Sequence, residues 1–203
     1  NNFTNSLDKT ENIIADFSDD KLSTAISHLA FGLIERFKKT NESIYILSCD
    51  NLSNNGNILK KVIKDFIFEI NNEPNYWLDE KVSFPNTMVD CIVPNTSIIP
   101  DGVNLNYVDE SVVICEPYRD WYIESNDYYL KSILNHPRIK FVDDVSFYED
   151  VKLKILNASH SAIAYLGLIF DYTYVHEAIL DKKIKIFISD YLDQEVLPTL
   201  KLK

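Results

Sequence analysis

Three side chains in one short stretch, Lys152, Asn157 and His160, have types and spacing that could support chemistry. An amine base, an amide and an imidazole on one rigid face form a plausible active-site constellation. On an ideal α-helix, Asn157 and His160 lie roughly 140° and 80° around the axis from Lys152, so the three can share a side. The same spacing also fits a structural helix with a solvated Lys152, a capping or packing Asn157 and a buried His160.

A helix from about Lys152 onward must position these residues. Apolar side chains recur in it at near-helical spacing, and neither proline nor glycine interrupts it before Gly167. The apolar positions are Leu153, Leu156, Ile163, Leu166 and Ile169.

The first third of the chain has the alternation of an α/β sheet. An amphipathic helix capped by Asp19 or Asp20 is predicted to run to about Lys39. A buried strand follows over residues 43–49, and a second amphipathic helix begins after Gly56. These elements predict the α/β fold class.

Asp50 and Asn51 end the predicted strand, and ligands of α/β sheets bind beyond the carboxyl ends of the strands. An Asx turn with a helix cap would need the same residue types, so both interpretations stay open. Farther along, Asp90 lies in an apolar setting where a carboxylate needs a partner, either in a site or among backbone amides.

The rest of the chain is predicted to mix short strands and helices. Residues 95–111 are expected to be loop, and strands are expected over residues 111–116, 121–124 and 139–142. Arg119 is expected to fix the carboxylate of Glu116 or Asp120. Two helices are predicted over residues 174–180 and 182–197, the second stopped by Pro198.

Composition excludes several classes of partner. The 203 residues carry a net charge of −11 and offer no basic stripe for nucleic acid. No apolar run approaches the roughly 18 residues of a membrane span. Cys49, Cys91 and Cys115 are isolated, which suggests a reducing, cytoplasmic compartment and predicts neither a disulfide framework nor a metal site.

Residues 152–167 closely resemble the catalytic helix of the polyol-specific long-chain dehydrogenases, whose signature is Lys, four residues, Asn, two residues, His. That family includes mannitol 2-dehydrogenase, fructuronate reductase and arabinitol dehydrogenase. Further segments match it in order, namely Ser48–Gly56, Phe84–Asp90 and Cys115–Trp121. The resemblance implies a middle piece of such an enzyme: residues 1–78 would end a Rossmann-type cofactor domain, and residues 79–203 would begin a mostly helical catalytic domain.

The resemblance also implies the chemistry, a metal-free hydride transfer between NAD or NADP and a polyol, ketose or hexuronate. Lys152 would be the general acid and base, and Asn51 and Asn157 would hold the reacting oxygen. His160 would bind a substrate hydroxyl and orient Lys152, while Asp90 would bind a neighbouring hydroxyl or assist proton exchange. Because an exposed lysine titrates near 10.4, burial and nearby positive charge are expected to make Lys152 a better base.

Two departures from the family pattern leave alternatives open. The chain has only four glycines and lacks the Gly-rich phosphate loop, so no cofactor-binding residue is assigned. Cys91 stands where the family usually carries arginine. The alternatives are a mannitol-1-phosphate 5-dehydrogenase, which residues 157–167 and 177–184 also resemble, and a truncated, non-catalytic relative that acts as a binding or structural module.

Overall fold

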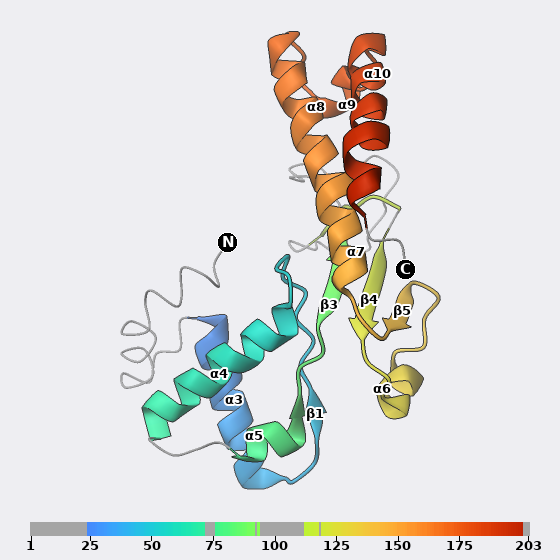
Figure 1. The fold of residues 1–203 in the computed structure, drawn as a ribbon. Helices are drawn as coiled ribbons and strands as arrows, with labels where there is room; N and C mark the ends of the chain where they lie inside the picture. Colours follow the sequence, from blue (N-terminus) through green and yellow to red (C-terminus); the bar gives the residue numbers. More distant parts are fainter. Residues whose placement is uncertain (1–23, 72–75, 92, 94–111, 118, 201–203) are drawn as a thin grey trace, which may run out of the picture. The chain divides into compact units, whose positions relative to one another are not determined.

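The computed structural model describes residues 24–71, 76–91, 93, 112–117 and 119–200, drawn in colour in Figure 1. The chain divides into two compact units. The first contains Asn1–Thr87 and Ile123–Asn135, and the second contains Met88–Tyr122 and His136–Lys203.

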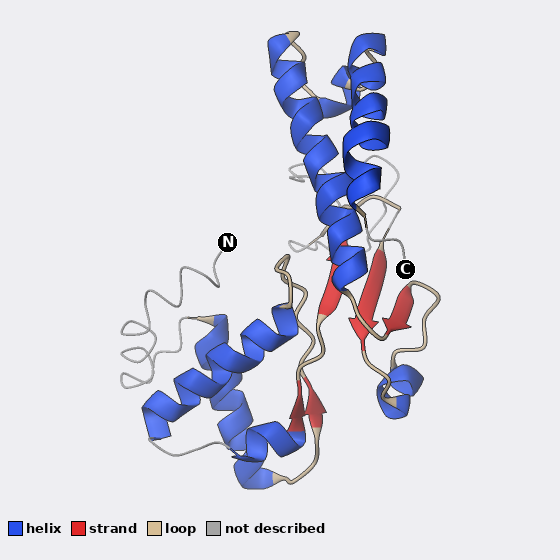
Figure 2. Cartoon of the chain, in the orientation of Figure 1, coloured by secondary structure: helices blue, strands red, loops and turns tan. Residues whose placement is uncertain are grey.

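A short parallel sheet with helices forms the described part of the first unit (Figures 1 and 2). Its elements are α3 (Ala25–Lys39), β1 (Ile44–Tyr45), α4 (Asn55–Asn71), α5 (Tyr76–Lys81), β2 (Val82–Ser83) and α6 (Tyr128–Ile133). Ile44 of β1 lies opposite Val82 of β2. Parallel neighbours require a crossover connection, which α4 and α5 supply. This β–α–β order confirms the predicted α/β class.

The apolar stripes of α3 and α4 pack together as the core of this unit. Ala30 of α3 and Ile63 and Ile67 of α4 are fully buried. Burying each large aliphatic side chain contributes about 1.5–3 kcal/mol, which holds the two helices as one support for β1 and β2. The other buried members are Ile26, Leu33, Leu59, Val62, Phe66, Leu78, Val82 and Phe84.

Two boundaries in this unit differ from the prediction. The helix α3 begins at Ala25, with Thr24 as its N-cap, because Thr24 and Ser27 satisfy each other's backbone N–H groups in a capping box. Asp19 and Asp20 lie outside the described residues. The strand predicted over residues 43–49 was too long, because beyond Ile46 its backbone meets side chains rather than a ladder: the carbonyl of Ser48 accepts from Asn55.

The second unit combines a mixed set of strands with a helical hairpin. The strands β3 (Thr87–Asp90), β4 (Asp120–Glu124) and β5 (Ile139–Val142) form a sheet in the order β3-β4-β5. The chain passes from the first unit to the second at the start of β3, and the last residues of β4 belong to the first unit. The strands predicted over residues 121–124 and 139–142 are confirmed.

One long helical segment follows the sheet. It consists of α7 (Ser146–Val151), the π-helical turn η1 (Lys152–Asn157) and α8 (Ala158–Ile169). After α9 (Val175–Ala178) the chain returns as α10 (Lys182–Tyr191), which packs beside α8 around Ile163, Ile184 and Ile188 (Figure 1). The hairpin thereby fixes the segment that carries Lys152.

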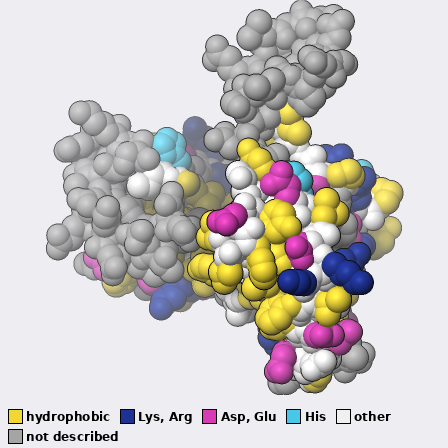
Figure 3. Space-filling model, turned by 90° about the horizontal axis from the view of Figure 1, so that it is seen from above, with side chains coloured by type: hydrophobic (Ala, Val, Ile, Leu, Met, Phe, Trp, Pro, Cys, Tyr) yellow, Lys and Arg dark blue, Asp and Glu magenta, His cyan; other side chains and the backbone are white. Residues whose placement is uncertain are grey.

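Large apolar side chains also remain exposed near the turn of this hairpin. Leu168, Ile169 and Leu180 are 70%, 73% and 81% exposed, respectively. Figure 3 shows hydrophobic side chains interspersed with acidic and basic ones on the surface that it views.

Two predictions for the second unit were wrong in detail. Residues 112–116 are not a strand, and Val113 is 67% exposed, so the apolar run finds no ladder partner in the described part of the chain. The last predicted helix ends sooner: α10 stops at Tyr191 and continues as a π-helical turn, Leu192–Val196, and a 3₁₀ turn, Leu197–Thr199, that contains Pro198. Residues 95–111, predicted to be loop, lie outside the described residues.

Candidate active site

The segment that carries the predicted site residues is wider than an ideal α-helix. In η1 the N–H of Ala158 donates to the carbonyl of Leu153, five residues earlier. A turn closed between residues five apart brings positions such as 152 and 157 closer to one face than the roughly 140° of an ideal α-helix. The π-helical turn therefore favours a common face for Lys152 and Asn157, and π-helical turns are frequent at functional sites.

Lys152 is buried at the start of this turn, with 8% of its side chain exposed. Its Nζ donates to the carbonyl oxygen of Val89 at 3.0 Å and lies 3.3 Å from Oδ1 of Asp90. Both partners belong to β3, so helix and strand hold the amine from two sides. A buried ammonium is costly unless it is paired and hydrogen-bonded, and these contacts meet both needs.

Lys154, two positions along, has different surroundings. Its Nζ lies 2.9 Å from Oδ2 of Asp150 on the same helical segment, and the two side chains are 38% and 51% exposed. This pair is the ordinary helix-surface contact between residues four apart. Of these two neighbouring lysines, only Lys152 is enclosed.

Asp90 therefore has the partner that its apolar setting required. Its side chain is 19% exposed and faces Lys152. A carboxylate therefore lies beside Lys152, and the positive charge that was expected near the amine stays a prediction.

Asn157 and His160 are held by the same helical segment as Lys152. Asn157 is half-buried at the end of η1, and its carbonyl accepts from the hydroxyl of Ser161 at 3.0 Å. His160 lies in α8 and is exposed, not buried as the structural interpretation of the helix would have it. Their convergence on one substrate stays a prediction.

Asn51 lies in the turn between β1 and α4 of the first unit, and it is exposed. Its backbone N–H donates to Oδ1 of Asp50 at 2.9 Å, the Asx-type contact that the sequence left open. This contact orders the turn and leaves the role of the Asn51 side chain as a prediction. Its approach to Lys152 also stays a prediction.

The residue that builds this turn is Asn55, which the site prediction missed. It is 2% exposed, and its Nδ2 donates to the carbonyls of Ser48, Asp50 and Thr87 at 3.2, 3.0 and 2.9 Å. Its Oδ1 accepts from the N–H of Thr87 at 2.9 Å. One buried amide thus ties the end of β1 to the start of β3, which carries Asp90.

Gly56 shows how closely the same turn packs. A Cβ at this position would meet the carbonyl oxygen of Pro85 at 2.4 Å, so only glycine fits. Nearby, Oδ1 of Asn86 accepts from the N–H of Asn57 at 3.1 Å, and its Nδ2 donates to Glu124 at 3.3 Å. The sequence did carry a sign of this packed turn, because the segment that ends at Gly56 is rich in asparagine.

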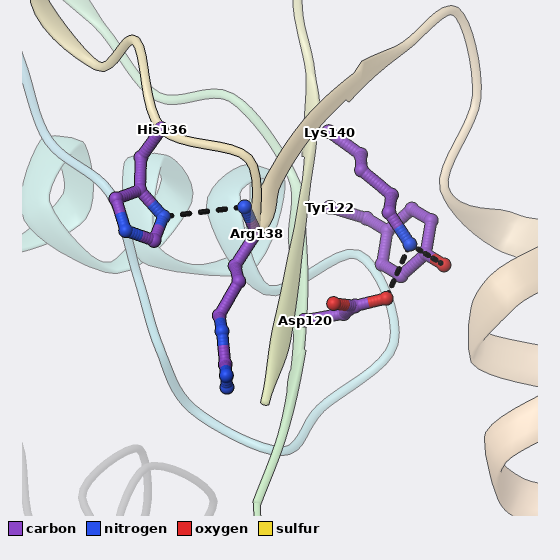
Figure 4. A network of polar contacts seen from close by, with 5 residues as sticks. All are labelled: Asp120, Tyr122, His136, Arg138 and Lys140. Atoms are coloured by element: carbon purple, nitrogen blue, oxygen red, sulfur yellow. Dashed lines mark hydrogen bonds and ion pairs between the residues drawn. The ribbon is translucent and has the colours of Figure 1, made fainter. Parts of the chain in front are cut away.

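A second polar cluster lies around the β4 and β5 strands (Figure 4). Lys140 forms an ion pair with Asp120 and donates to the Tyr122 hydroxyl at 3.2 Å, and Nδ1 of His136 accepts from the N–H of Arg138 at 3.2 Å. The hydrogen bond to Asp120 raises the pKa of Lys140, so this lysine stays charged and serves as a strand-to-strand brace. The carboxylate of Asp120, which Arg119 was expected to fix, is paired with Lys140.

Within the described ranges, no group of three or more His, Cys, Asp or Glu side chains could hold a metal ion. The described helices likewise include none long and apolar enough to cross a membrane.

Family models match almost the whole chain. The mannitol dehydrogenase Rossmann domain matches residues 1–134, and the mannitol dehydrogenase C-terminal domain matches residues 144–203. The chain belongs to the mannitol dehydrogenase family. The predicted family and the order of a Rossmann-type part followed by a mostly helical part are thereby confirmed. The predicted division after residue 78 stays a prediction, because the compact units divide after Thr87 and the family models between residues 134 and 144.

Named relatives agree with this assignment. The chain is 34% identical over 183 residues to mannitol 2-dehydrogenase of Emericella nidulans, covering 87% of this chain and 36% of the relative. It is 31% identical over 185 residues to the polyol:NADP oxidoreductase of Gluconobacter oxydans, covering 90% and 38%. The chain therefore spans little more than a third of the length of these curated relatives.

Solved structures of two family members resemble the fold. The ternary complex of Pseudomonas fluorescens mannitol 2-dehydrogenase with NAD and D-mannitol aligns with a TM-score of 0.68 and 31% identity. The alignment covers 89% of this chain and 37% of that one. A substrate-free D-sorbitol dehydrogenase aligns with a TM-score of 0.74 and 27% identity, covering 94% and 40%.

Proposed function

We propose that the intact protein carrying this chain is a metal-independent, NAD(P)-dependent oxidoreductase that interconverts a sugar alcohol or hexonate with its keto form. The mannitol/fructose and mannonate/fructuronate pairs are the substrate types that we favour. The observation that carries the proposal is the enclosed Lys152 amine, 3.3 Å from Asp90 and 3.0 Å from the Val89 carbonyl. Its free cysteines fit a reducing, cytoplasmic setting.

Lys152 is the proposed general acid and base. In alcohol oxidation its neutral amine accepts the hydroxyl proton as the carbon loses hydride, and in ketone reduction its ammonium returns that proton. The Asp90 carboxylate, 3.3 Å from Nζ, would hold the amine in place in both directions.

The remaining predicted residues would bind and orient the substrate. The amides of Asn157 and Asn51 would donate to the oxygen on which negative charge develops, because preorganised donors stabilise that charge. His160, exposed on α8, would hydrogen-bond a substrate hydroxyl. Asp90 would accept from a neighbouring hydroxyl while it holds Lys152.

The first unit offers a setting that fits a dinucleotide. Parallel strands with a helical crossover bind ligands beyond their carboxyl ends, and the exposed Asn51 turn follows β1 at that end. We propose that this turn lies against the reactive end of the nucleotide. When bound, NAD(P) would supply the hydride acceptor or donor. The four glycines of this chain, at positions 32, 56, 102 and 167, do not form a Gly-rich phosphate loop, so no phosphate-binding residue is assigned.

A nucleotide-reduction assay on the intact protein tests the proposal. Mannitol, sorbitol, arabinitol, mannonate and mannitol 1-phosphate would each be offered with NAD⁺ or NADP⁺, before and after exhaustive treatment with EDTA. We expect turnover of an unphosphorylated polyol or hexonate that survives chelation. Activity that EDTA abolishes and zinc restores would contradict a lysine mechanism, and folded protein that neither binds nucleotide nor turns over any substrate would support the non-catalytic alternative.

A further inference from the structure

Two cysteines of the second unit lie close to the Lys152–Asp90 pair. Cys91 directly follows Asp90, the last residue of β3, and Cys115 lies a few residues before β4. Both are half-buried and neither is in a disulfide. Cys49, in the first unit, is exposed and serves as an internal control.

The pairing of β3 with β4 brings the end of β3, next to Cys91, close to the start of β4, which follows Cys115 by a few residues. The N–H of Glu124, the last residue of β4, donates to the carbonyl of Asn86, immediately before β3, at 2.9 Å. The start of β3 therefore lies beside the end of β4, so the two neighbouring strands run antiparallel and the end of β3 meets the start of β4. Cys91, which directly follows β3, therefore lies near the residues that directly precede β4.

Arg119 links that segment to Cys115. It stands directly before β4, and its Nη1 lies 3.7 Å from the Sγ of Cys115. Burial, followed by the hydrogen bond to Cys115, raises the pKa of the Cys91 thiol. The Arg119 guanidinium is thus a cationic hydrogen-bond donor beside the Cys115 sulfur.

We propose that Cys91 and Cys115 are a redox-active pair that forms a reversible disulfide when hydrogen peroxide oxidises the protein. The Cys115 thiolate attacks one peroxide oxygen and breaks the O–O bond, which leaves a sulfenic acid and, after protonation, one water. The Cys91 sulfur then attacks the sulfenic sulfur, loses its proton and expels a second water. The two sulfurs together lose two electrons, and the peroxide takes them up.

The disulfide would act on the site through Asp90. A disulfide requires its two Cα atoms to lie about 4.4–6.8 Å apart, so its formation constrains the backbone at Cys91. Val89 and Asp90, the two residues before Cys91, are those that contact Lys152. Oxidation would therefore disturb the anchor of Lys152, and this consequence for activity rests on the proposed function, whereas the disulfide itself does not.

Peptide mapping tests the pair independently of activity. The reduced, folded intact protein would be titrated with hydrogen peroxide, blocked with N-ethylmaleimide, digested without reductant and analysed by mass spectrometry. We expect a peptide that links Cys91 to Cys115, a matching loss of maleimide at both residues, and full reversal by dithiothreitol. Cys49→Ser should leave the link unchanged.

Single substitutions define the order of the steps. In Cys91→Ser the link should vanish and a dimedone adduct should accumulate on Cys115, whereas Cys115→Ser should give little adduct at Cys91. Separate alkylation of Cys91 and Cys115 after peroxide treatment of the folded protein would overturn the proposal. A link that involves Cys49 in preference to either would overturn it as well.

Discussion

The two ion pairs of the α7–η1–α8 segment contain the same residue types in different surroundings. Lys152 reaches across to β3, where Asp90 and a backbone carbonyl enclose it, while Lys154 meets Asp150 on its own helix and stays partly exposed. Burying the Lys152–Asp90 pair costs desolvation free energy. A surface pair such as Lys154–Asp150 avoids that cost and stabilises a helix by a few tenths of a kcal/mol. This contrast supports the proposal that Lys152 is placed for chemistry, whereas Lys154 contacts only its own helical segment through Asp150.

Replacing each lysine should separate the two pairs most strongly. In the intact protein, Lys152→Ala should lower turnover by about 10²–10⁴-fold, because proton transfer by a positioned side chain accelerates a reaction by about that factor. Lys154→Ala should retain turnover within about twofold. Steady-state and single-turnover rates measure both. Equal losses in the two variants would leave the segment as packing alone.

Replacing each carboxylate should lower turnover through only one pair. Asp90→Asn removes the anionic contact that holds the Lys152 amine, so turnover of polyol should fall by about tenfold or more, because a misplaced catalytic group reacts slowly. Steady-state rates of polyol oxidation measure the fall. Asp150→Asn should keep turnover within about twofold, and equal losses in both variants would argue against a specific role for Asp90.

Two glycines of the first unit also differ in their surroundings: Gly56 is closely packed, and Gly32 has open space around it. Gly56→Ala places a Cβ 2.4 Å from the Pro85 carbonyl oxygen and should lower the free energy of unfolding by about 1–3 kcal/mol. Gly32→Ala, within α3 with nothing within 4 Å, should raise it by about 0.5–1 kcal/mol. Denaturant unfolding distinguishes them, and similar effects of both substitutions would contradict the close packing at Gly56.

The smallest effect is expected when the exposed Lys154–Asp150 pair is removed and the free energy of unfolding is measured. Lys154→Met removes its contact with Asp150 but keeps a good helix former, so the free energy of unfolding should change by no more than about 0.5 kcal/mol. Denaturant unfolding of the intact protein would show whether it does. A loss of several kcal/mol would mean that Lys154 is enclosed as firmly as Lys152.

The fold was predictable from the sequence wherever a long periodic pattern determined it. The apolar stripes of α3 and α4 recur over many turns, and their packing confirms the predicted helices. The strand at residues 43–49 was overestimated because composition records burial, whereas ladder pairing depends on a distant partner. There the Asn55 amide, seven residues from Ser48, takes the carbonyl that a neighbouring strand would otherwise bind.

The candidate site was predictable in its residue types but not in its surroundings. The carboxylate partner of Lys152 lies in β3, and only tertiary structure brings Asp90 beside it. The π-helical turn also escaped prediction, because the pattern of apolar residues in η1 is compatible with an α-helix. Asn55 was missed because a buried amide that satisfies four backbone groups has the same sequence signal as a turn asparagine.

The pH dependence of hydride transfer in a single turnover shows whether Lys152 is the base. The burst of NAD(P)H formed from polyol by the intact protein would be recorded across pH for the parent, Lys152→Ala and Lys154→Ala. If Lys152 is the base, the parent and Lys154→Ala rates should rise together with pH, because only a neutral amine accepts the hydroxyl proton, while Lys152→Ala should be slow and lose that rise. A Lys152→Ala protein that transfers hydride at the parent rate with the parent pH profile would contradict it.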